Sequence, residues 1–115
     1  MNLGLLGEPI EFNPSYFEIP RKFEMLGRTI EVVYDDKLLY KENVVGEARY
    51  REGKIILQPS TEEHPISEDG LIQNFLHELL HFVLYEAGEK ELTKDERLVD
   101  LFSGLLTQFF KTRSF

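Results

Sequence analysis

His77-Glu78-Leu79-Leu80-His81 lies inside a long apolar segment and matches the pattern H-E-x-x-H. Residues four apart lie on nearly the same face of an α-helix, so the two histidines stack one turn apart. Two imidazoles at that spacing can bind one Zn²⁺, which leaves Glu78 beside the open coordination position. A carboxylate there can take a proton from a water molecule that the metal has acidified. The pattern therefore indicates a metal site. The alternative, two polar residues on a helix flank, is disfavoured by the helical context.

The segment 71–87 around the motif is predicted to be one helix, with Gly88 just past its C-terminal end. Its apolar residues cover most of the circumference: Leu71, Ile72, Phe75, Leu76, Leu79, Leu80, Phe82, Val83 and Leu84. A helix that is apolar nearly all round is central and buried. The narrow polar strip that remains consists of Asn74, His77, His81 and Tyr85. A metal site supplies a reason to keep such a strip on a buried helix.

A second helix is predicted over 93–111. Thr93-Lys94-Asp95-Glu96 fits the capping box T-x-x-E, with Thr93 as its first residue. Lys111 suits the C-terminal end of a helix, where the helix dipole favours a cation. A broad apolar face is formed by Leu98, Val99, Leu101, Phe102, Leu105, Leu106, Phe109 and Phe110.

Three strands are expected before the helices, at 28–34, 44–51 and 54–58, so that the sheet occupies 28–58. Their connections are too short for crossover helices, and we therefore expect a mainly antiparallel sheet. Strands followed by helices indicate an α+β fold. Residues 1–25 contain three prolines among scattered aromatics, which predicts an extended N-terminal arm lying against the body; the residues are Pro9, Pro14, Pro20, Phe12, Tyr16, Phe17 and Phe23.

The length of 115 residues predicts a single domain, 1–115. A formal charge of −8 argues against nucleic acid as a partner, because phosphate binding needs clustered Lys and Arg, and gives no support to a membrane partner. There is no cysteine, so a thiolate zinc site is excluded. The N-terminal residues lack a basic region followed by a long apolar run, so we expect no signal peptide and a cytoplasmic protein.

A catalytic zinc site needs three protein ligands, and Glu96 is the best third candidate. It lies near the start of the second helix, and Asp100 follows one turn later on the same face, where it could orient a ligand. The alternatives are a capping role for Glu96 and a solvated position for Asp100. Glu86 lies about 180° around the helix from His77 and is excluded. Less favoured carboxylates and a third imidazole lie in the loops: Glu89, Glu91 and His64.

H-E-L-L-H, a glycine-ended loop and then E-R-L-V-D resemble the zincin metallopeptidases, and the glutamate-ligand branch, the gluzincins, most closely. The small size and the order of elements resemble phage and prophage proteins related to the ImmA/IrrE-type peptidases. The resemblance covers about residues 28–111. It implies a minimal zincin-like fold, an oxyanion stabiliser for which Tyr85 and His64 are the candidates, and a peptide or protein substrate in the host cytoplasm.

Our interpretation is a zinc-dependent peptidase in which His77, His81 and Glu96 hold the metal and Glu78 is the general base. The strand 54–58 is expected to pair with an extended substrate, with an ordinary strand as an equal alternative. Two other functions stay open. One is a non-catalytic domain stabilised by zinc, and the other is a metal-free phage accessory protein that acts through its acidic surface or its aromatic arm. The sequence leaves the substrate and the oligomeric state open.

Overall fold

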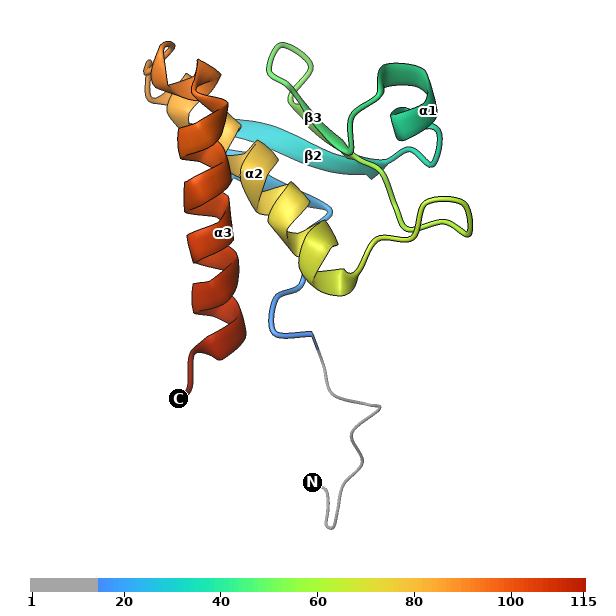
Figure 1. Ribbon diagram of the computed structural model, residues 1–115. Coiled ribbons are helices and arrows are strands. Elements are labelled where there is room, and N and C mark those ends of the chain that lie inside the picture. The colour runs from blue at the N-terminus through green and yellow to red at the C-terminus, as the bar shows by residue number, and fades with distance from the viewer. Residues whose placement is uncertain (1–14) are drawn as a thin grey trace.

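The computed structural model describes residues 15–115. The sheet has four strands. Figure 1 shows one long helix against the sheet and a second long helix on the far side of the first. The elements in chain order are β1 (Lys22–Met25), β2 (Arg28–Tyr34), α1 (Leu38–Glu42), β3 (Gly46–Arg49), β4 (Lys54–Leu57), α2 (Glu68–Glu86), the 3₁₀ helix η1 (Leu92–Lys94) and α3 (Glu96–Thr112). The predicted α+β class is confirmed.

The sheet differs from the three-stranded, mainly antiparallel sheet that we expected. It has four strands in the order β1-β2-β4-β3, and the central pair, β2 and β4, is parallel. The outer pairs are antiparallel. The prediction was wrong because the chain between β2 and β4 crosses over through a five-residue helix, α1, and the strand β3. A short helix and a strand together provide the reversal that usually needs one long helix.

The extra strand, β1, comes from the C-terminal end of the predicted arm. A two-residue turn joins it to β2, and both turn residues, Leu26 and Gly27, have positive φ. Two such residues form the hairpin turn whose twist matches that of paired strands. Of the arm residues before it, Tyr16 and Phe17 pack against the core, whereas Pro9, Phe12 and Pro14 lie outside the described residues.

The strand that we expected to be open to a substrate is an interior one. β4 lies between β2 and β3, and its residues Ile55, Ile56 and Leu57 are buried. The edge of the sheet on this side is β3, which pairs with β4 along one side only in the described part of the chain. Any β-addition at this side of the sheet therefore has to use β3.

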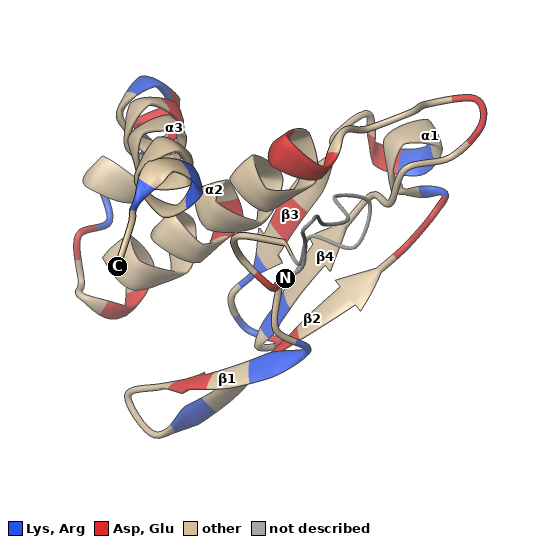
Figure 2. Ribbon diagram, turned by 90° about the horizontal axis from the view of Figure 1, so that it is seen from below, with Lys and Arg blue, Asp and Glu red and all other residues tan. Residues whose placement is uncertain are grey.

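The long helix α2 lies between the sheet and α3 in both ribbon views (Figure 1, Figure 2). It buries its apolar side chains against the strands, and Phe75 and Phe82 are almost completely inaccessible. Phe17 extends this core toward the end of α3, with ring centroids 5.9 Å from Phe75 and 4.9 Å from Phe110. Among residues 15–115, no helix is both long and apolar enough to cross a membrane.

The ends of α2 have clear local causes. Ser67 caps its N-terminus by accepting a hydrogen bond from the Gly70 amide, so the helix begins before the expected residue 71. At the other end Gly88, at φ 81°, is the left-handed residue that the sequence predicted. Its amide donates to the Tyr85 carbonyl, and the Glu89 amide donates to the Leu84 carbonyl. This Schellman pair ends the helix and turns the chain back toward α3.

At the start of α3 the capping box that we predicted, with Thr93 as its first residue, is wrong. Asp95, not Thr93, is the N-cap, because its carboxylate accepts a hydrogen bond from the Leu98 amide at 3.1 Å. Thr93 lies two residues earlier, in η1, and is buried. Its hydroxyl group is directed at α2 instead, where it contacts His81.

Candidate metal centre

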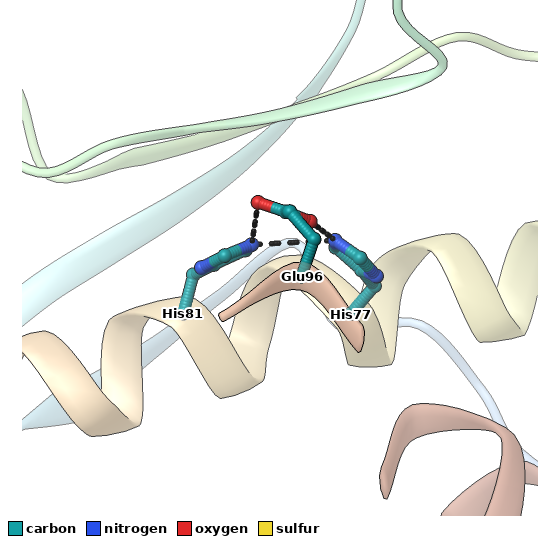
Figure 3. Close-up of side chains that lie close together, drawn as sticks. All are labelled: His77, His81 and Glu96. Atoms are coloured by element: carbon teal, nitrogen blue, oxygen red, sulfur yellow. Dashed lines mark hydrogen bonds and ion pairs between the residues drawn. The ribbon is translucent and has the colours of Figure 1, made fainter. Parts of the chain in front are cut away.

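Three side chains from two helices converge on one point (Figure 3). His77 and His81 come from successive turns of α2, and Glu96 is the first residue of α3. The distance from Glu96 Oε1 to His77 Nε2 is 3.0 Å, and that from Glu96 Oε2 to His81 Nε2 is 3.2 Å. The three candidate ligand atoms all lie within 4.8 Å of one another. The cluster could bind a metal ion, and two imidazoles with one carboxylate are a donor set found in catalytic zinc sites.

In both imidazoles the ring nitrogen that faces away from Glu96, Nδ1, has a hydrogen-bonding partner, as is usual for metal-binding histidines. His77 Nδ1 lies 2.9 Å from Asp100 Oδ1, and His81 Nδ1 lies 3.1 Å from Thr93 Oγ1. A partner on Nδ1 holds the proton there and leaves the Nε2 lone pair free. The two Nε2 atoms, 3.2 Å apart, therefore point at the same place as the Glu96 carboxylate. This arrangement fits a bound cation.

Thr93 is the residue that sequence reasoning misassigned. Its hydroxyl group donates to the His81 carbonyl oxygen at 3.1 Å, so its lone pairs are available for the Nδ1 proton of the same residue. The Tyr50 hydroxyl lies 3.2 Å from Thr93 Oγ1. A threonine in a short loop carries no sequence signal for this role, and the T-x-x-E pattern directed attention to the helix end instead.

Glu78 is buried beside the cluster but is not one of its three converging side chains. Only 8% of its surface is exposed, and it packs against β3 where Gly46 leaves room. A Cβ atom at Gly46 would lie 2.9 Å from Glu78 Oε2, so a larger residue would displace the carboxyl group. Burial, and to a smaller extent the carboxylates of Glu96 and Glu47, raises the pKa of Glu78 to about 8. A divalent cation held nearby would favour the ionised form.

A cleft of about 950 Å³ opens over these side chains. One wall is the edge strand β3 with the segment before it, and the floor is the polar strip of α2. The far end is formed by the loop that leads from α2 to α3. All of the candidate ligands, with Glu78 and Asp100, line this cleft. Concave sites with a few convergent polar groups are where ligands bind.

Of the two candidates for an oxyanion stabiliser, the structure brings only Tyr85 to the cleft. Its ring stacks on that of Tyr50, with centroids 4.1 Å apart, and both rings line the cleft. His64 is exposed in the connector before α2, where its amide donates to Thr61 Oγ1, and it is not part of the cleft lining. Tyr50 directly follows β3, and sequence reasoning did not select it.

The excluded carboxylate, Glu86, and the less favoured ones, Glu89 and Glu91, lie away from the cluster. Glu86 forms an ion pair with Arg28 at 2.6 Å, on the side of α2 that faces the start of β2. Glu89 and Glu91 are exposed in the loop after α2 and contribute no ligand atom to the cluster.

Comparison of this chain with models of protein families, with curated proteins and with solved structures finds no match.

Proposed function

We propose that this protein is a small zinc-dependent peptidase of the gluzincin type. The observation that carries the proposal is the position of Glu78: a buried carboxyl group beside three converging donors, facing an open cleft. A site that only held a metal would gain nothing from burying a further acidic group there, because burial of an unpaired carboxyl group costs free energy.

In this proposal the side chains have separate roles in the hydrolysis of a peptide bond. Zinc bound by His77, His81 and Glu96 would supply Lewis acidity, which polarises a carbonyl group and lowers the pKa of water. Glu78 accepts the proton of the attacking water and donates it to the leaving amine. The Tyr85 hydroxyl, from its position in the cleft, is the candidate donor to the oxygen that gains negative charge.

The substrate in this proposal is an extended peptide that adds to the free edge of β3. Gly46, Glu47 and Ala48 of this strand line the cleft opposite α2, and the strand has no other partner among residues 15–115. Backbone hydrogen bonds to an edge strand hold a peptide without regard to its sequence. The neighbouring Val44 and Val45 give that end of the cleft an apolar surface.

The test is Glu78→Gln against the wild type, with zinc content and cleavage measured on the same samples. We expect one zinc per chain in both proteins and chelator-sensitive cleavage of a broad peptide library by the wild type. The variant should lose the cleavage by orders of magnitude, because the amide keeps the shape and removes the basicity. Cleavage that persists unchanged in Glu78→Gln would contradict the assignment of the base.

A second function, zinc as a structural staple, is favoured by one observation. The cluster joins the middle of α2 to the first residue of α3, and so ties two helices together. A chain this small gains stability from such a link. Zinc-loaded wild type that is folded but cleaves nothing in the library would favour the staple over the peptidase.

A further inference from the structure

Among residues 15–115, nothing covers much of the apolar surface of α3. Four large side chains along it are about half exposed: Leu101 at 55%, Phe102 at 47%, Leu105 at 54% and Phe109 at 58%. The residues that it buries are smaller and partly polar: Val99, Ser103 and Thr107. The apolar side of the helix and its buried side therefore do not coincide. A soluble helix normally turns its apolar side inward, so the mismatch indicates that this surface has another partner.

Three of these exposed side chains form a regular row with the half-buried Leu98. Leu98, Phe102, Leu105 and Phe109 follow one another at intervals of four, three and four residues. This is the spacing with which two helices pack side by side as a coiled-coil pair. We call these four residues the apolar row. It contains no charged residue, although the protein as a whole has a net charge of −8, so two molecules can meet along it without bringing like charges together.

The size of the surface suits a small stable interface. If Leu101, Phe102, Leu105 and Phe109 each have a full area of about 200 Å², their exposed fractions leave roughly 400 Å² of apolar surface on the row and on Leu101 beside it. The half-buried Leu98 and the polar residues that border the row add to this. The smaller specific interfaces bury about 600 Å² on each partner, so this apolar surface would form the centre of the interface and the bordering residues would form its rim.

We propose that a second copy of this chain covers the apolar row, through antiparallel pairing of α3 with α3 about a two-fold axis. The row is self-complementary in this arrangement. With the axis between Ser103 and Gly104, Phe102 of one subunit lies opposite Leu105 of the other, and Leu98 lies opposite Phe109. Each layer of the interface then combines one phenylalanine with one leucine, which is how antiparallel coiled-coil pairs fill their core.

A dimer of this kind would also support the metal centre, because α3 carries Glu96 and Asp100. In one chain α3 lies on the outer side of α2, away from the sheet (Figure 1). A partner along the opposite side would hold the helix from both sides. The proposal does not depend on catalysis, and its test needs no substrate.

Sedimentation equilibrium of the full chain, over concentrations from about 5 to about 200 µM, measures the assembly. We expect the wild type to approach twice the chain mass of 13.5 kDa. Leu105→Glu should be monomeric throughout, because it places a charge in the centre of the interface. The matched control is Tyr40→Glu, which adds the same charge at a large exposed residue of α1 and should leave the dimer intact. Circular dichroism shows that each variant is folded.

A second experiment tests the register. Phe102→Lys alone should also be monomeric, but a mixture of Phe102→Lys with Leu105→Glu should form a heterodimer, because the lysine of one chain lies opposite the glutamate of the other. A monomeric wild type over the whole range would overturn the proposal, and so would a dimer that Leu105→Glu does not weaken. A mixture that stays monomeric would overturn the antiparallel pairing.

Discussion

The two imidazoles of the metal centre are held in different ways. His77 Nδ1 meets the carboxylate of Asp100, whose side chain is 69% exposed. His81 Nδ1 meets the hydroxyl group of Thr93, a residue only 8% exposed. The first contact is charged but open to water, and the second is neutral but enclosed. Water can replace an exposed partner and cannot reach a buried one. The neutral, enclosed partner should therefore matter more to zinc binding than the charged, exposed one.

The largest effect tests whether the two rings bind a metal at all. His81→Ala should lower zinc affinity by more than about a thousandfold, because it removes a ligand from a three-ligand site. Competition with a chromophoric chelator measures the affinity, and zinc should raise the melting temperature of the wild type but not of the variant. His64→Ala is the matched control, since His64 is exposed and outside the cluster. Equal zinc affinity in the two variants would refute the metal centre.

The next test removes the group that contacts both rings. Glu96→Ala should weaken zinc binding by roughly a hundredfold or more, because a carboxylate ligand is lost. Glu91→Ala changes an exposed carboxylate of the preceding loop that contributes no ligand atom, and its affinity should match that of the wild type. If both variants bound zinc as the wild type does, the third ligand would have to lie elsewhere.

Thr93→Val tests the enclosed contact. Valine keeps the shape but leaves the Nδ1 proton without an acceptor, and zinc affinity should fall by about ten- to a hundredfold. Thr93→Ser keeps the hydroxyl group and should lose little. The capping role that the sequence suggested would cost about 1 kcal/mol of stability and leave zinc binding unchanged. Affinity and the free energy of unfolding, measured together, separate the two roles.

Asp100→Asn should have the smallest effect, at most about tenfold in zinc affinity. The amide oxygen can still accept the Nδ1 proton of His77, and water reaches this side of the site. Competition with the same chromophoric chelator measures the zinc affinity of this variant. A loss greater than that of Thr93→Val would reverse the comparison, and the exposed carboxylate would then be the more important support.

The sequence was most informative where a residue acts through helical spacing. The positions of His77, His81, Glu96 and Asp100 follow from intervals of four residues on two helices, and the structure brings all four together. Gly88 was predictable for a similar reason, because a helix end needs a residue that tolerates positive φ.

The errors arose where distant parts of the chain decide the outcome. Thr93 and Asp95 are both good N-cap residues, and only the tertiary contact with His81 assigns Thr93 elsewhere. The parallel pairing of β2 with β4 depends on how α1 and β3 occupy the intervening chain. Strand pairing of this kind is set by packing across the sheet and leaves little trace in local sequence. The cleft depends on the edge position of β3, and that position could not be predicted without knowing that β2 pairs with β4.

The parallel pairing of β2 with β4 also has a consequence for the order of folding. Parallel strands can meet only after the intervening loop has closed, and contacts between distant residues form slowly. The metal ligands, by contrast, lie on α2 and α3 alone, and none of them belongs to the sheet. The metal site therefore needs none of the β2–β4 contacts. We expect a folding chain to acquire its affinity for metal independently of that pairing, so that metal capture does not have to wait for the substrate-binding surface at β3.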